Sequence, residues 1–204
     1  MLKLFLTLIV IASIFVSVSA YSDHGKPPIQ GIVNNFTELS RPAPASITPL
    51  LSRDQGQITL ETYHGKFVLL NFWATWCVPC MHELPSLSRL NAQLSDENFQ
   101  VILVSQDRGG FKQTDKFLKK HKIDISGAFI DNKLKYSRAM KINAIPTTIL
   151  IGPTGTEIGR LVGSIEWDHP EAIALINYYL KHEIKDKGKI SLIKKIRRYF
   201  SKSF

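Results

Sequence analysis

The sequence of 204 residues predicts an α/β protein. Two observations predict this class. Short apolar runs typical of strands alternate along the chain with segments that have helical spacing, and this order is typical of a sheet with right-handed crossovers. In addition, a glycine- and proline-containing turn at residues 152–155 separates two strand-like runs, 147–151 and 157–162, which indicates an antiparallel hairpin.

The first expected elements are two strands before the cysteines and a helix that contains Cys80. Gln57–Thr62 alternates apolar and polar residues, as a half-buried strand does. Phe67–Trp73 is a continuous apolar run, which favours a buried central strand. Pro79–Leu94 carries leucines at helical spacing and is expected to be a helix with a kink at Pro85.

A second strand–helix unit follows. Its strand is expected at Phe99–Ser105, and its helix at Phe111–His121 comes after a turn at Gly109 and Gly110. The remaining expected elements are a short strand at Ala128–Asp131, a short helix at Leu134–Met140 and a closing helix at Trp167–Tyr179. No internal repeat interrupts this order, so residues 51–183 are predicted to form one domain.

The N-terminal segment predicts export. Residues 1–20 combine Lys3, an apolar stretch and the small residues at 18–20, which together are typical of a cleavable signal peptide. A retained N-terminal anchor is the alternative. Residues 21–50 are rich in Pro, Ser and Thr and are interpreted as a loosely packed lead-in. The expected location is therefore periplasmic or otherwise extracytoplasmic.

The C-terminal tail, residues 184–204, is strongly basic. From Lys185 onward it has eight Lys or Arg residues and one Asp, which is +7 of the formal net charge of +9. In residues 189–204 the apolar residues recur at helical spacing, namely Ile190, Ile193, Ile196, Phe200 and Phe204. Such a basic amphipathic helix can lie on an anionic membrane, or its apolar side can pack on the domain. Export argues against a nucleic-acid partner.

The two cysteines, Cys77 and Cys80, are separated by two residues and follow the apolar run. This spacing indicates a dithiol that opens and closes as a disulfide. If a helix begins at Cys77, both sulfurs lie on one face of its first turn, and the positive end of the helix stabilises a thiolate. The thiolate is the nucleophile in disulfide exchange, and the second cysteine resolves the mixed disulfide. Pro79 suits the first turn because it lacks an N–H.

Other interpretations of the two cysteines have less support from the sequence. A structural disulfide would close too short a ring to contribute much stability. Zinc prefers four ligands, and the chain has no second cysteine pair. Covalent haem attachment needs His directly after the second cysteine, whereas Met81 stands there. Cu(I) held by Cys77, Cys80, Met81 or a histidine stays open, because thiolates and thioethers suit that ion.

With these residues in view, the sequence resembles the TlpA/ResA-like thiol-disulfide oxidoreductases of the thioredoxin superfamily. The matches span roughly residues 55 to 180. They are Gly65-Lys66 before VLLNFWATWCVPC at 68–80, Glu83-Leu84-Pro85, Val104 to Asp107, Ile145 to Thr148, and Gly163 near Trp167. The resemblance implies a thioredoxin-like fold, in which a central mixed sheet carries helices on both faces.

The resemblance also implies roles for single residues. Cys77 would be the attacking thiol and Cys80 the resolving one. Pro146 matches the family's cis-proline, which places the backbone of Ile145 and Thr147 where a partner chain can pair with it. Trp76 is expected to shield one side of the disulfide and to contact the partner.

Glu83 matches a glutamate that serves as the acid/base group near the thiols in this family. A carboxyl group partly buried near a thiol has a raised pKa and can relay the proton of Cys80. Cytoplasmic thioredoxins have a buried aspartate six residues before the first cysteine, and Asn71 stands there in this chain. Because Asn cannot titrate, Glu83 is the nearest candidate for its role.

The resulting expectation is an exported oxidoreductase that reduces disulfides of other exported proteins and needs no bound cofactor or metal. A membrane-bound thiol reductant would restore the dithiol. The family suggests cytochrome c maturation or copper-site assembly, although Thr147 replaces the glutamate usual in the cytochrome-maturation branch. Two alternatives stay open: a copper-binding metallochaperone, and a disulfide-forming oxidase whose direction depends on its reduction potential.

Overall fold

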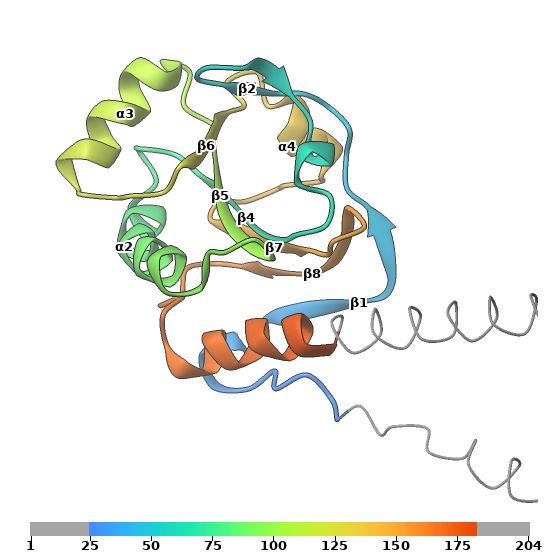
Figure 1. Cartoon of the computed structure of the whole chain (residues 1–204). Coiled ribbons are helices and arrows are strands. Elements are labelled where there is room, and N and C mark those ends of the chain that lie inside the picture. The colour runs from blue at the N-terminus through green and yellow to red at the C-terminus, as the bar shows by residue number, and fades with distance from the viewer. Residues whose placement is uncertain (1–24, 183–204) are drawn as a thin grey trace, which may run out of the picture.

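The computed structural model describes residues 25–182 (Figure 1). Its core is one eight-stranded mixed sheet. From one edge to the other, the strands are β1 (Phe36–Pro44), β8 (Thr156–Val162), β7 (Thr147–Ile151), β4 (Phe67–Trp73), β5 (Phe99–Ser105), β6 (Gly127–Ile130), β2 (Leu50–Ser52) and β3 (Gly56–Ile58). The predicted signal peptide at 1–20 and basic tail at 184–204 lie outside the described residues.

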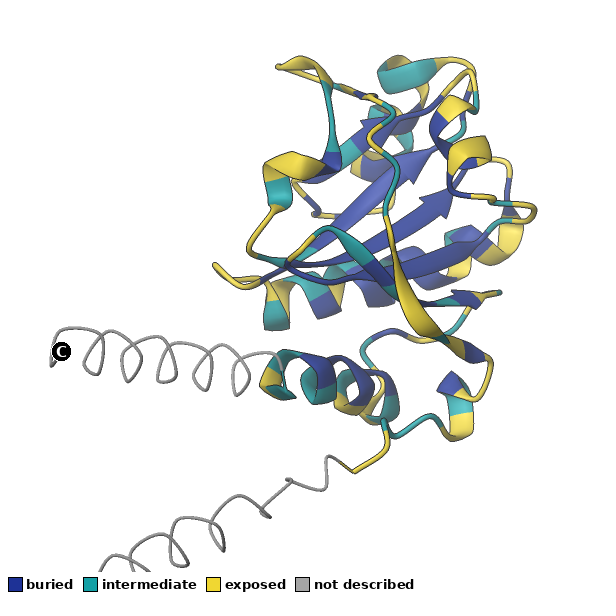
Figure 2. Ribbon diagram, turned by 90° about the vertical axis from the view of Figure 1, so that its right-hand side faces the viewer, coloured by how far each residue is buried: buried dark blue, intermediate teal, exposed yellow. Residues whose placement is uncertain are grey.

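The central strand β4 organises the sheet. It pairs in parallel with β5 and antiparallel with β7, and β5 pairs in parallel with β6. All seven residues of β4 are buried, as its continuous apolar run predicts. The hairpin of β7 and β8 is antiparallel, as its turn predicts. Figure 2 shows the buried residues concentrated on these central strands.

Helices cover both faces of the sheet. They are α2 (Val78–Leu94), α3 (Gly110–Lys120), α4 (Lys135–Ala139) and a last helix whose described part covers residues 170–182. Two 3-10 turns, Gly31–Val33 and Leu60–Tyr63, complete the layers. The mixed sheet with helices on both faces confirms the predicted thioredoxin-like fold.

Two separate apolar cores follow from the alternation of β4. One core contains Leu69 and Trp73 and packs against α2, α3 and the last helix. The other contains Leu70 and Phe72 and packs against Tyr136 of α4. Successive side chains of a strand point to opposite faces, so a strand with two apolar faces needs cover on both. The helices packed in the two cores provide that cover.

The lead-in prediction is wrong for residues 36–44. These residues form β1, which pairs antiparallel with β8 and continues the main sheet. Phe36 is buried in the core beside α2 and the last helix. The strand lacks an alternating pattern because most of its side chains are exposed, and it ends at Pro44. Proline is tolerated there because edge strands can leave an N–H position unpaired.

Two further boundaries differ from the prediction. The strand expected at Gln57–Thr62 ends at Ile58, and Leu60–Tyr63 forms a 3-10 turn that buries Leu60. The alternation of apolar residues fits either structure over so short a segment. The closing helix begins at residue 170 rather than 167, since Trp167 lies in the preceding turn. Among residues 25–182, no helix is long and apolar enough to cross a membrane.

Candidate active site

The two cysteines lie at the N-terminus of α2. Cys77 is the N-cap residue, and its sulfur accepts a hydrogen bond from the backbone N–H of Cys80 at 3.3 Å. The two sulfurs are bonded at 2.01 Å. Pro79 stands in the first turn, where its missing N–H costs nothing. Unpaired N–H groups and the helix dipole therefore face Cys77, and both favour a thiolate there once the bond is reduced.

The two sulfurs differ in access. Cys77 is 5% exposed, whereas Cys80 is fully buried. Between them, Val78 and Pro79 are exposed, and Trp76 just before them is 65% exposed. A partner can approach Cys77 across this apolar rim, while Cys80 is shielded by the domain.

Glu83 lies one turn further along α2 and is completely buried. Its Oε1 accepts a hydrogen bond from the Asn71 side-chain amide at 2.7 Å, and its Oε2 accepts one from Trp167 Nε1 at 3.2 Å. Burial raises the pKa of Glu83 to about 7, although these two donors favour the carboxylate and act against the rise. A group with this pKa can both give and take a proton near neutral pH.

Asn71 holds Glu83 in place from the sheet. Its amide nitrogen donates to Glu83 and to the Thr148 hydroxyl, at 2.7 and 2.9 Å. Its own Oδ1 has no hydrogen-bond partner among the described residues. Asn71 lies in β4 and Thr148 opposite it in β7, so the sheet register aligns both with the carboxyl group. The site thus contains a buried carboxyl group that is held by uncharged polar side chains, by Asn71 directly and by Thr148 through Asn71.

Pro146 directly precedes β7, and the Ile145–Pro146 peptide bond is cis. Thr147 pairs with Phe72 near the end of β4, only five positions before Cys77. The register therefore brings the Ile145–Thr147 segment to the same sheet end as the cysteines. Pro146 and Thr147 are buried, and Ile145 is half-buried. Whether this segment pairs with a partner stays a prediction.

Asp107 also lies at the site, although no sequence pattern assigns it a role. It follows β5, is fully buried, and accepts hydrogen bonds from the backbone N–H and the hydroxyl of Thr75 at 2.9 and 2.7 Å. The Ser105 hydroxyl and the Gln113 amide also donate to it, each at 2.8 Å. One carboxylate thus ties the segment before Cys77 to β5 and α3. Its position inside the matched 104–107 motif was the available signal.

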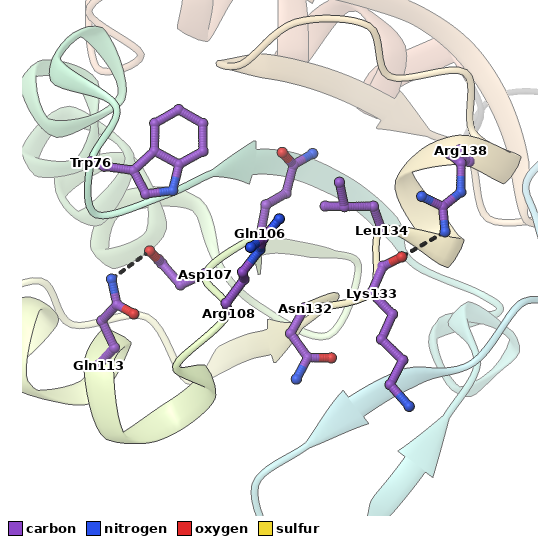
Figure 3. Close-up of a pocket in the computed structure, with 9 residues that line it drawn as sticks. All are labelled: Trp76, Gln106, Asp107, Arg108, Gln113, Asn132, Lys133, Leu134 and Arg138. Carbon is purple, nitrogen blue, oxygen red and sulfur yellow. Dashed lines mark hydrogen bonds between the residues drawn. The ribbon is translucent and has the colours of Figure 1, made fainter.

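A groove opens beside Trp76. The larger of its two cavities, about 800 Å³, is shown in Figure 3. It lies between the segment before α2, the segment that joins β5 to α3, and the loop that leads into α4. Trp76 and Gln113 lie on one side of the view, and Lys133, Leu134 and Arg138 on the other. Among residues 25–182, no cluster of three or more His, Cys, Asp or Glu side chains is placed to hold a metal ion.

Comparisons with known proteins agree with this geometry. The Redoxin family profile matches residues 38–176. Thiol-disulfide oxidoreductase ResA of Oceanobacillus iheyensis is 34% identical over 119 residues, which are 58% of this chain and 60% of that protein. ResA of Geobacillus kaustophilus is 30% identical over 132 residues, 63% of this chain and 74% of that protein. The chain thus spans about 60% of the length of some curated relatives that it matches.

Solved structures show the same fold. A crystal structure from Chlorobium tepidum, assigned as a thiol:disulfide interchange protein DsbE, has a TM-score of 0.61 at 26% identity, covering 70% of this chain and 99% of that one. StoA from Bacillus subtilis has a TM-score of 0.53 at 22% identity, covering 63% and 97%. The resemblance to TlpA/ResA-like proteins is confirmed by these matches. Because its profile covers residues 38–176, the chain belongs to the Redoxin family.

Proposed function

We propose that this protein is a thiol-disulfide oxidoreductase that reduces disulfides of other proteins through Cys77 and Cys80. The observation that carries the proposal is the Cys77–Cys80 disulfide at the N-terminus of α2, with the fully buried Glu83 one turn behind it. The relatives named thiol-disulfide oxidoreductase ResA support the same chemistry.

The reaction follows from the different access of the two sulfurs. The Cys77 thiolate attacks one sulfur of the substrate disulfide, and the other substrate sulfur leaves as a thiolate that takes a proton from solvent. Cys80 passes its proton to the Glu83 carboxylate and attacks the Cys77 sulfur. This step forms the Cys77–Cys80 disulfide and releases the second substrate sulfur as a thiolate, which takes the proton from Glu83. The substrate gains two electrons from the Cys77–Cys80 pair and two protons, one from Cys80 by way of Glu83 and one from solvent, to which Cys77 had released its own proton.

The finer assignments belong to the same proposal. The substrates are exported proteins, with cytochrome c cysteines before haem attachment and copper-site cysteines as the two candidate groups. A membrane-bound thiol reductant returns the electrons to Cys77–Cys80. The extracytoplasmic location depends on residues 1–20, which lie outside the described residues.

A trapping experiment tests the proposal. Cys80→Ser cannot resolve the mixed disulfide, so we expect it to accumulate a covalent complex with a disulfide-containing test protein on a non-reducing gel. Cys77→Ser should form no such complex, because Cys80 is fully buried. Equal trapping by both variants would contradict the assigned roles. Stoichiometric Cu(I) binding without any disulfide turnover would replace the proposal with a metallochaperone.

A further inference from the structure

The groove beside Trp76 has chemistry that the dithiol reaction does not use. It consists of two adjoining cavities of about 800 and 450 Å³. Both are lined by Trp76, Gln106, Leu134 and Arg138, so they form one continuous depression, which we call the basic groove. The second cavity is also lined by Ile145. The basic groove therefore extends from the exposed tryptophan before Cys77 to the residue before Pro146.

The charge of the basic groove is one-sided. Arg108, Lys133 and Arg138 line it, and all three are exposed. Within residues 25–182, none of the three forms an ion pair, whereas nearby Arg53 is paired with Asp115. The only carboxylate in the lining is Asp107, which is fully buried and accepts hydrogen bonds from its neighbours. The groove thus presents three exposed positive charges, and its one carboxylate is buried.

The wall that carries two of these charges is held in place. Asp131 accepts hydrogen bonds from the backbone N–H groups of Tyr136 and Ser137 at the start of α4, at 3.2 and 2.7 Å. Its carbonyl oxygen accepts one from Leu134 N–H at 2.9 Å. An Arg138 terminal nitrogen donates to the Lys133 carbonyl oxygen at 2.6 Å, as Figure 3 shows. Because the loop is already ordered, a ligand that binds it loses less conformational entropy.

We propose that the basic groove binds an acidic segment of the substrate polypeptide, close to the disulfide that Cys77 attacks. This inference rests on the proposed function. Carboxylates suit the two guanidinium groups, which can form paired hydrogen bonds with them. The side-chain amides of Gln106 and Asn132 can pair with the polar backbone of an extended segment. Trp76 and Leu134 supply apolar contact between the charged positions.

Peptide disulfides that differ only in charge test this inference. Three peptides of equal length carry the same internal disulfide, flanked by Asp and Glu, by Asn and Gln, or by Lys. The rate constant for their reduction by the reduced full-length protein is measured at low and high salt. We expect the acidic peptide to react at least about 10-fold faster than the neutral one at low salt, since complementary charge raises association rates. This preference should shrink at high salt.

Variants of the protein test whether the preference for the acidic peptide arises in the basic groove. In Arg108→Gln/Lys133→Gln, the ratio of the acidic to the neutral rate should fall close to one. Arg138→Lys keeps the charge and should retain most of the preference. Lys119→Gln changes an exposed lysine at the far end of α3 and should leave the ratio at its wild-type value. A preference that survives in the double variant, or equal rates for all three peptides, would overturn the inference.

A small neutral disulfide separates this inference from the proposed function. If the wild-type protein reduces hydroxyethyl disulfide but reduces the three peptides equally, the dithiol chemistry stands and the acidic-segment inference fails. If it reduces none of these disulfides, the proposed function itself fails.

Discussion

At the residue scale, Glu83 is an acidic side chain in a place where negative charge is costly. Its pKa of about 7 follows from complete burial, while hydrogen bonds from Asn71 and Trp167 keep the carboxylate form accessible. A surface glutamate would remain ionised throughout the neutral range and could not act as a proton donor there. The surroundings of Glu83 are therefore those expected of a carboxyl group that exchanges a proton with Cys80, as proposed above.

The raised pKa predicts how the stability of the oxidised protein depends on pH. Between about pH 4.5 and 7 the folded state binds a proton at Glu83 that the unfolded state has released. The contribution of Glu83 is fully present below pH 4.5 and is lost as pH rises through 7, by about 3 kcal/mol in total. Urea unfolding of wild type and Glu83→Gln from pH 4 to 8 measures this difference.

The same variant tests the kinetic role. Glu83→Gln should slow disulfide reduction and flatten its pH dependence around pH 7, because Gln cannot accept the proton of Cys80. Glu97→Gln, which removes an exposed carboxylate, is the matched control and should leave both profiles unchanged. Identical pH profiles for wild type and Glu83→Gln would contradict the assignment.

The local part of this site could be predicted from the sequence. Cys77, Cys80 and Glu83 belong to one helix, so their spacing alone places them on one face. The residues that form hydrogen bonds around Glu83 could not be predicted from spacing. Asn71, Thr148 and Trp167 reach the site through contacts that join residues 12 to 84 positions apart. Only the sheet register and the packing of the turn before the last helix bring them together.

At the element scale, the segment before α2 depends on Asp107. This carboxylate accepts hydrogen bonds from both the N–H and the hydroxyl of Thr75. It therefore holds the backbone segment that precedes Cys77 in place. It comes from the end of β5, 32 positions further along the chain. The contact arises because parallel strands β4 and β5 end at the same edge of the sheet. Sequence patterns alone do not show which side chain makes it.

Substitution of Asp107 should disturb stability and reactivity together. Asp107→Asn leaves at least one buried donor without an acceptor, which costs about 1–3 kcal/mol of unfolding free energy. We also expect a changed thiol pKa of Cys77, measured by the pH dependence of alkylation, because the segment that positions it is released. Asp124→Asn, at an exposed carboxylate, serves as the control. A destabilised variant with an unaltered thiol pKa would reduce Asp107 to a purely structural role.

The edge strand β1 depends on a close approach to β8. A Cβ added to Gly159 would lie 2.6 Å from the Phe36 ring and 2.7 Å from the Thr37 carbonyl oxygen. The strand was missed in the sequence because its side chains are mostly exposed and because Pro residues suggested a linker. Its position follows from pairing with β8, which no local pattern reports.

Gly159→Ala should therefore separate β1 from the sheet. We expect a loss of about 1–3 kcal/mol in the free energy of unfolding, as for other overpacked sites. Gly25→Ala, where an added Cβ meets nothing within 4 Å, is the matched control. Equal stability of the two variants in urea would show that β1 is dispensable for the fold.

At the scale of the whole molecule, the sheet gathers the chemistry at one end. The ends of β4 and β5 and the start of β7 supply the dithiol segment, Asp107 and Pro146, respectively. The alternation of strands and helices predicts the fold class, and the cysteine motif after the apolar run predicts the site's location. The basic groove could not be predicted, because Arg108 follows β5 and Arg138 lies in α4, and only the folded sheet brings them together.

The direction of electron flow is the central claim, and the reduction potential of the Cys77–Cys80 pair tests it most directly. Equilibration of the protein in dithiothreitol buffers, followed by alkylation and mass measurement, gives this value. The proposed reductase predicts a two-electron titration with a potential near or below that of thioredoxin, about −270 mV. A potential near that of the oxidant DsbA, about −120 mV, would contradict the account and make the protein a donor of disulfides.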